Sequence, residues 1–256
     1  MGGHSVTHST RSASSHRPSL RGRLALTLLG GFELRHAGRP ATVPLSVERL
    51  LAFVALQNRP VNRCFAAGTL WPETTDERAG ANLRSALWRL RRISPSLVET
   101  SPTHLRLGSG TSVDTHQLSS SIWRILDPSK EPATEDLLHL CAPSDLLPGW
   151  YDEWVLVERE RIRQLRLHAL ETLCERLADT RRFGPAVEAG LCAVQEEPLR
   201  ESAQRSLIRA YLAEGNACEA IRQYRLYRRL LDEELGLKPS AELTDMVRPL
   251  TVARAE

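Results

Sequence analysis

The C-terminal half of the chain contains an internal repeat of 34 residues, and this repeat limits the folds that are open to it. Side chains 34 positions apart match in size in five pairs: Ala169 with Ala203, Leu173 with Leu207, Leu177 with Tyr211, Ala186 with Ala220, and Val187 with Ile221. This period is that of the tetratricopeptide helical hairpin. Two such units and their flanking helices would stack into a small solenoid. We therefore expect an all-α half from about residue 115 onward; a chance alignment of two amphipathic helices is the alternative.

The N-terminal half has a mixed pattern, with short strands before and after three helices. We expect, in order, strands around Gly30 and Gly38, a helix at 46–58 capped by Ser46, a short helix in "VNRCFAAGTLWP", a third helix at 77–93, a hairpin around Pro102 and a linker at 108–118. This order predicts a winged helix-turn-helix. Such folds place the third helix in the major groove of DNA.

The third helix, "ERAGANLRSALWRLRRI", carries one sign of charge along most of its length. From 78 to 92 it holds five arginines and no acid, although like charges one turn apart repel each other. At roughly 100° per residue, one face collects Ala79, Leu83, Ala86, Leu87 and Leu90. The opposite face, here called the arginine face, collects Arg78, Asn82, Ser85, Arg89 and Arg92, with Arg84 and Arg91 on its flank. We interpret the first face as buried and the arginine face as a phosphate-binding surface; a merely solvated basic face is the alternative.

Arginine suits this task because its guanidinium fork can bond O6 and N7 of guanine together. We therefore expect two groups of contacts, one to base edges and one to phosphates on the groove walls. The base-contacting candidates are Arg78, Asn82, Ser85, Arg89 and Arg92, and the phosphate-contacting candidates are Arg84, Trp88 and Arg91.

The charge of the chain divides at about residue 110. Residues 1–110 carry 15 basic and 6 acidic side chains, a balance of +9, whereas residues 111–256 carry 19 and 25, a balance of −6; together they give the net charge of +3. This asymmetry indicates an anion-binding half joined to a half with another role. We expect no basic face comparable to the arginine face in residues 113–256.

The sequence offers no pattern for metal, cofactor or catalytic chemistry. The five cysteines are scattered and form no C-x-x-C pair, so we expect reduced thiols packed in a core rather than a disulfide or a metal site. His4, His8 and His16 lie in the Ser-rich segment 1–20, which is typical of a disordered tail. No G-x-S-x-G, H-E-x-x-H or phosphate-loop motif occurs. We therefore expect no enzyme activity, no catalytic residue, no metal and no cofactor.

No apolar run approaches the roughly 18 to 20 residues needed to span a bilayer. The one segment that is similar to a signal peptide, "RGRLALTLLGGF", is followed by "ELRHAGR" instead of a small-residue cleavage site. We interpret this segment as a strand, and we expect a cytoplasmic protein with no membrane partner.

Four stretches carry a family resemblance: "LW" at 70–71, "AGANLRSALWRLRR" at 79–92, "VDTHQL" at 113–118 and "LLPGWYDEWVLVERERIRQLRLHALETL" at 146–173. Over residues 24 to about 248 the chain resembles the Streptomyces antibiotic regulatory protein class, and the stretch 146–173 is the most specific part of this resemblance. The implied fold is mainly α with a small β component: an OmpR-like winged helix-turn-helix followed by an all-α, tetratricopeptide-like bacterial transcriptional activation domain.

The resemblance also implies an organisation and a function. Residues 1–20 would be a disordered tail, 21–112 the DNA-binding domain, 113–250 the activation domain and 251–256 a short tail. The protein would bind direct repeats in promoters of secondary-metabolite or antibiotic clusters as a homodimer or side-by-side pair, and would recruit RNA polymerase holoenzyme. Its wing candidates are Ser101, Thr103, His104 and Arg106. Relatives commonly carry Gly-Tyr where Thr103 and His104 stand here, so the resemblance does not extend to a minor-groove contact of the wing.

Two alternatives stay open at the level of the sequence. "PGWYDEW" at 148–154 either anchors the start of a helix through its aromatic residues or faces a partner. The chain as a whole could also be a helical-repeat adaptor whose basic domain binds protein rather than DNA. Salt-dependent binding to duplex DNA distinguishes these two functions.

Overall fold

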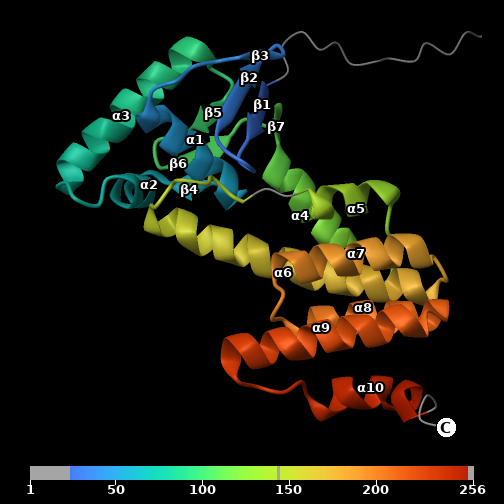
Figure 1. Cartoon of the computed structure of the whole chain (residues 1–256). Coiled ribbons are helices and arrows are strands. Elements are labelled where there is room, and N and C mark those ends of the chain that lie inside the picture. The colour runs from blue at the N-terminus through green and yellow to red at the C-terminus, as the bar shows by residue number, and fades with distance from the viewer. Residues whose placement is uncertain (1–23, 143–144, 253–256) are drawn as a thin grey trace, which may run out of the picture.

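The computed structural model describes residues 24–142 and 145–252 (Figure 1). The expected N-terminal tail with its three histidines lies outside the described residues, and so do residues 253–256 of the expected C-terminal tail. A small part that mixes strands and helices precedes an all-helical part, which confirms the predicted fold class. Within the described ranges, no helix combines the length and the apolar character needed to cross a membrane.

The N-terminal part combines three helices with two small sheets. The helices are α1 (Leu45–Gln57), α2 (Arg63–Leu70) and α3 (Asp76–Ile93). One sheet has the order β3-β2-β1-β7, formed by β1 (Leu24–Thr27), β2 (Glu33–His36), β3 (Arg39–Pro40) and β7 (Thr111–Val113). The other has the order β4-β6-β5, formed by β4 (Val61–Asn62), β5 (Val98–Thr100) and β6 (His104–Leu107). The antiparallel pair of β5 and β6 is the predicted hairpin, and the arrangement is that of a winged helix.

Side-chain hydrogen bonds explain where two of the three helices begin. The Asn62 side chain accepts from two backbone N–H groups at the start of α2, and the Thr75 side chain caps α3. The prediction for α1 was wrong in one respect: the helix starts at Leu45 after Pro44, and Ser46 lies inside it. Proline is suited to a helix start because its φ is fixed near the helical value and it has no N–H to satisfy.

The segment 108–118, predicted as a linker, is part of the fold. Residues 111–113 form β7, which pairs in parallel with β1, and α4 (Asp114–Leu126) follows at once. The Asp114 carboxylate accepts the backbone N–H groups of Leu28 at 2.9 Å and Leu29 at 2.9 Å. The predicted domain boundary after residue 112 therefore falls inside a strand. Short polar stretches can form such strands when a neighbouring strand supplies the hydrogen bonds.

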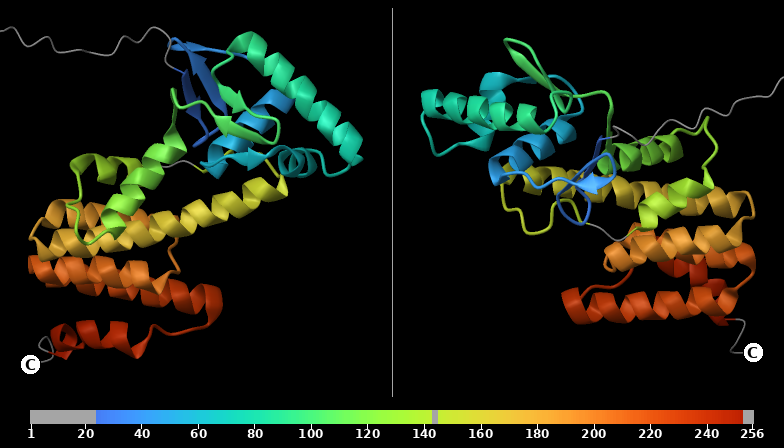
Figure 2. Two further views of the ribbon diagram at one scale, coloured as in Figure 1. Left: turned by 180° about the vertical axis from the view of Figure 1, so that it is seen from behind. Right: turned by 90° about the horizontal axis from the view of Figure 1, so that it is seen from above.

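The helical part stacks its remaining helices in layers beneath the winged helix (Figures 1 and 2). They are α5 (Thr134–Cys141), α6 (Glu153–Asp179), α7 (Phe183–Glu196), α8 (Glu201–Glu214), α9 (Ala217–Leu235) and α10 (Ala241–Val252). The C-terminal part of α6 pairs with α7, and α8 pairs with α9, which confirms the two predicted helical hairpins. The four repeat alanines, Ala169, Ala186, Ala203 and Ala220, are all fully buried.

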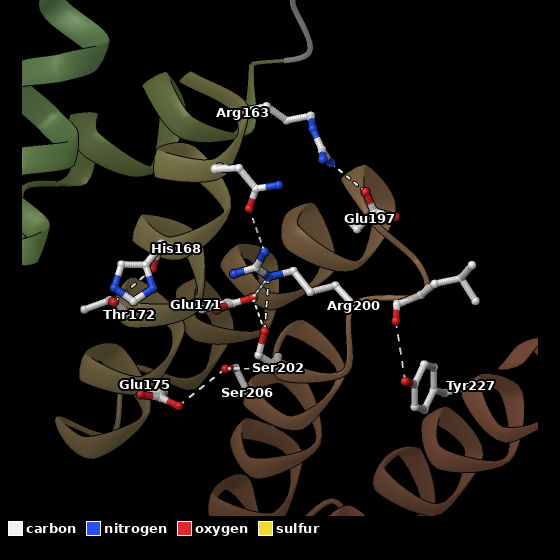
Figure 3. Close-up of polar contacts among 12 residues, drawn as sticks. Arg163, His168, Glu171, Thr172, Glu175, Glu197, Arg200, Ser202, Ser206 and Tyr227 are labelled. Carbon is white, nitrogen blue, oxygen red and sulfur yellow. Dashed lines mark hydrogen bonds and ion pairs between the residues drawn. The ribbon is translucent and has the colours of Figure 1, made fainter. Parts of the chain in front are cut away.

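Polar contacts join the first hairpin to the second (Figure 3). The buried Glu171 of α6 accepts hydrogen bonds from Arg200 Nε at 2.6 Å and from Ser202 Oγ at 2.7 Å. Arg163 Nη1 of α6 donates to Glu197, in the loop between α7 and α8, at 2.5 Å. A buried carboxylate requires such donors, because an unpaired charge in the interior is strongly destabilising. These contacts therefore fix the register of the stack.

The N-terminal half of α6 reaches out of this stack and packs beneath the winged helix. Trp154 meets Phe53 of α1 edge-on, with ring centroids 5.3 Å apart, and Trp150 stacks on Phe32 at 6.2 Å. Arg49 of α1 forms an ion pair with Asp152. Both tryptophans of "PGWYDEW" thus have the anchoring role, which was the structural interpretation of this motif. The tyrosine between them does not, because it is exposed.

The cysteine prediction was wrong at four of the five positions. Cys141 at the end of α5 and Cys192 of α7 form a disulfide, with Cα atoms 5.6 Å apart. Cys64 and Cys218 are exposed, and only Cys174 is a buried thiol, whose pKa burial raises to about 12. The bonded pair is separated by 51 residues, so its proximity depends on the packing of α5 against α7.

Replacing Cys141 by serine is expected to lower the free energy of unfolding by about 2–4 kcal/mol, because the cross-link restricts the unfolded chain. Urea unfolding of the full chain, followed by far-UV circular dichroism, measures this. Cys218→Ser is the matched control, since that thiol is exposed and free, and its effect should stay within about 0.5 kcal/mol. Equal stability of the untreated and fully reduced protein would show that the cross-link has no such role.

Candidate nucleic-acid interface

The helix α3 is buried along one side and charged along the other. Its buried residues are Ala79, Leu83, Ala86, Leu87 and Leu90, the five that the helical period predicted. They pack into the core together with α1 and α2. This packing fixes the rotation of α3 about its axis, and the arginine face consequently points outward.

The arginine face has no carboxylate partner. Arg78, Arg84, Arg89, Arg91 and Arg92 are all exposed, and among residues 24–142 and 145–252 none of them forms an ion pair with an acid. The only acids on α3 are Asp76 and Glu77 in the first turn, where they complement the positive end of the helix dipole. The charge of the four arginines that follow Arg78 is therefore not neutralised by the helix itself.

Two of these arginines are held in place by neutral groups. Arg91 donates to Thr100 Oγ1 at 2.7 Å, which links α3 to strand β5 of the hairpin. The Arg92 guanidinium lies 5.1 Å from the ring centroid of Trp88, a cation–π contact. The Trp88 side chain itself is 60% exposed. Such contacts keep the charge available for an anion while they restrict the orientation of the side chain.

The two uncharged candidates on the arginine face differ in exposure. Ser85 is exposed, one turn before Arg89, whereas Asn82 is half-buried. A small side chain beside an arginine lets a surface approach the helix closely. The exposed arginines and Ser85 together form a positively charged ridge along the helix.

The wing candidates hold one another in the hairpin turn. Ser101 Oγ accepts from the His104 backbone N–H at 2.9 Å, and Thr103 Oγ1 lies 2.9 Å from His104 Nδ1. Arg106 faces Glu99 across the hairpin, with the charged atoms 3.8 Å apart. All four side chains are exposed, but Ser101, Thr103 and His104 are engaged in the turn. The wing therefore has a formed tip and an arginine whose charge is partly compensated.

One basic residue near this ridge was missed by the sequence reasoning. Arg63, the first residue of α2, donates to the Ser101 carbonyl at 3.4 Å and lines a hollow of about 290 Å³ that Arg84 also lines. The cap Asn62 was the available signal, because it fixes the start of α2 and thereby places Arg63 in the first turn. Asp76 and Pro102 also line this hollow, which thus lies between α2, α3 and the tip of the wing.

Within the described residues, one group of side chains has the proximity of a metal site. The potential ligand atoms of Cys141, Glu188 and Cys192 lie within 4.8 Å of one another. Both sulfur atoms of this group are joined in the disulfide, so they are not thiolates that could bind a cation.

The comparisons with known proteins concern both parts of the chain. Residues 132–250 match the family described as "Bacterial transcriptional activator domain". The regulatory protein AfsR of Streptomyces griseus is 25% identical over 256 residues, which cover 93% of this chain and 26% of that protein. AfsR of Streptomyces coelicolor is 26% identical over 209 residues, with coverages of 77% and 21%. The chain thus spans about a quarter of the length of these relatives.

A solved structure shares the fold. It is that of EmbR from Mycobacterium tuberculosis, in complex with a low-affinity phosphopeptide, with a TM-score of 0.70 and 20% sequence identity over 90% of this chain and 65% of that one. At this identity the likeness concerns the fold alone. The family match places a bacterial transcriptional activator domain over residues 132–250, and the two AfsR proteins are similar to this chain over most of its length.

Proposed function

We propose that this protein is a sequence-specific DNA-binding transcriptional activator without enzymatic activity. The observation that carries the proposal is the arginine face: five exposed arginines without an acidic partner in the described residues, on a helix whose other face is buried. A line of like charges is unfavourable in the free protein. Phosphates of duplex DNA supply the missing counter-charges, and releasing their bound cations adds to the affinity.

In this proposal α3 enters the major groove, which is wide enough for a helix. Arg78, Asn82, Ser85, Arg89 and Arg92 contact base edges, and Arg84, Trp88 and Arg91 contact phosphates on the groove walls. The link from Arg91 to Thr100 suits a positioning contact, because it restrains the guanidinium beside the hairpin. Arg63 is added as a further phosphate contact. The wing residues Ser101, Thr103, His104 and Arg106 lie close to the backbone of the DNA.

The proposed partners are those implied by the resemblance to the Streptomyces antibiotic regulatory protein class. Residues 21–112 form the DNA-binding domain and residues 113–250 the activation domain. The activation domain binds RNA polymerase holoenzyme, while α3 selects the DNA sequence that is bound. The sites are direct repeats in promoters of secondary-metabolite or antibiotic clusters, bound by a homodimer or side-by-side pair. A protein that acts on chromosomal DNA in a bacterium works in the cytoplasm.

Two linked experiments test the proposal with the full chain. Selection from a random duplex library should enrich one motif, repeated in the same orientation at a spacing near one helical turn of about 10–10.5 base pairs. Transcription in vitro from a promoter that bears this repeat should rise when the protein is added. Recovery of random sequences would contradict specific recognition. An enriched motif without increased transcription would contradict activation.

Replacing Arg89 by alanine tests base reading. Arg89 lies in the middle of the arginine face, has no ionic partner in the described chain and follows Ser85 by one turn. Its loss is expected to cost about 1–3 kcal/mol of binding free energy and to relax the preference at one base pair. Competition with single-base variants of the selected duplex measures this, and Arg182→Ala, an exposed arginine in the loop before α7, is the control. Equal weakening for every duplex would make Arg89 a phosphate contact.

Replacing Arg84 or Arg91 by alanine tests positioning. Each substitution should reduce the slope of log affinity against log salt by about one unit and leave the selected motif unchanged. For Arg91, Thr100→Val is the matched control, because it removes the hydrogen bond at 2.7 Å and keeps the charge. A changed motif with an unchanged slope would reverse the roles of the two groups of residues.

A further inference from the structure

The helical part carries a second basic face, on α9, and the expectation of none comparable in residues 113–256 was wrong. Ile221, Arg222, Arg225, Leu226, Arg228 and Arg229 line a hollow of about 550 Å³ on the surface of α9. All four arginines are exposed. Arg222 lies 3.6 Å from Glu219, whereas no ion pair or hydrogen bond engages the other three side chains within the described ranges.

The surroundings of this α9 face favour a short protein segment over a nucleic acid. The arginines lie within eight residues of helix, from 222 to 229, about 10 Å at 1.5 Å per residue. The exposed acids Asp232, Glu233 and Glu234 follow within the next turn, and they would repel a continuous run of phosphates. Leu226 in the middle of the face is 49% exposed and offers an apolar contact that a phosphate backbone cannot use.

A face of matching pattern lies on the N-terminal half of α6. Glu153, Leu156, Val157 and Glu160 are exposed at spacings of three, four and seven residues, so they share one side of the helix. Leu156 is 44% exposed, Val157 61%, and the neighbouring Tyr151 81%. Two apolar residues thus lie between two acids, whereas on α9 an apolar residue lies among arginines.

Both acids of the α6 face carry charge that a partner can use. Glu153 has no bonded cation among the described residues. Glu160 accepts from Arg163 at 2.9 Å and from Gln164 at 2.8 Å, and these bonds hold its pKa at about 2, well below the usual value. Glu160 is therefore ionised at neutral pH, with one flank already compensated. The opposite side of this half of α6 is covered by the winged helix through Trp154, so only the exposed side is free to bind.

The α6 face and the α9 face of one copy do not contact each other through ion pairs or hydrogen bonds in the described part of the chain. Figure 1 shows the N-terminal half of α6 beneath the winged helix and α9 in the next layer of the stack. A second copy presents both faces again. Each copy can therefore offer its α6 face to one neighbour and its α9 face to another.

We propose that the exposed α6 face of one copy docks on the basic α9 face of a second copy. The contact joins two different surfaces, so the copies are arranged head to tail. This inference rests on the proposed function, since a head-to-tail pair matches two DNA half-sites that point in the same direction. Both faces are small, and the contact is weak in free solution. Binding to adjacent half-sites raises the effective concentration of the two faces and closes the contact.

The test measures cooperative binding of the full chain to duplexes with one half-site, two direct half-sites or two inverted half-sites. The wild type is expected to bind the direct pair about tenfold more tightly than two independent sites would allow, and the inverted pair without this gain. Glu153→Arg with Glu160→Arg should abolish the gain, as should Arg225→Glu with Arg229→Glu. Each variant should keep its affinity for a single half-site and its thermal unfolding curve. Glu188→Arg, an exposed acid on α7, is the control and should keep the gain.

Mixing the two double variants decides the matter. The reversed α6 face of one meets the reversed α9 face of the other, so an equimolar mixture should regain cooperativity that neither variant has alone. Failure of the mixture to regain it, or cooperativity that survives in either variant, overturns the proposed contact. If the wild type does not bind a single half-site, the proposed DNA binding itself is refuted. Failure of the docking contact and failure of the proposed function therefore give different results.

Discussion

The attachment of the winged helix to the helical stack is the constraint on which the rest of the structure depends. Asp114 takes up the N–H groups of Leu28 and Leu29 at the end of β1, and the Trp154 ring packs on Phe53 of α1. Burial raises the pKa of the Asp114 carboxyl, and the backbone N–H bonds oppose that effect. Asp114 lies at the start of α4 and Trp154 at the start of α6, and both contact the winged helix. These contacts therefore hold α3 at a fixed position relative to α6 and α9. When α3 binds a DNA site, the positions of the α6 and α9 surfaces relative to that site are therefore fixed as well.

The stability of α3 depends on tertiary packing rather than on its own charges. Each like-charged pair one turn apart costs about 0.2–0.5 kcal/mol, whereas burying a leucine contributes about 1.5–3 kcal/mol. Leu83, Leu87 and Leu90 are all buried, so their burial outweighs the repulsion. The protein can therefore maintain an uncompensated arginine face in the free state. The same argument applies to α9, where Tyr227 and Leu231 are buried beneath the arginines.

Features with a regular period could be predicted from the sequence, and features that depend on distant partners could not. The leucine spacing predicted the buried face of α3, and the 34-residue period predicted the two hairpins. The strand β7 was missed because its three residues have no pattern of their own and pair with β1 more than 80 positions away. The disulfide was missed because nothing in the spacing of Cys141 and Cys192 indicates that α5 lies against α7. The exposed α6 face was hidden within "PGWYDEWVLVERE", where buried and exposed apolar residues alternate too closely to be separated.

The salt dependence of duplex DNA binding by the full chain tests the central claim most directly. If Arg63, Arg84 and Arg91 each neutralise one phosphate, log affinity should fall linearly with log salt concentration with a slope of about −3 per bound copy, since each neutralised phosphate contributes roughly −0.9. The affinity should also be higher for the selected motif than for random duplex at every salt concentration. Binding that does not change between low and high salt, or no binding to duplex DNA at all, would contradict the account and favour an adaptor whose basic part binds protein.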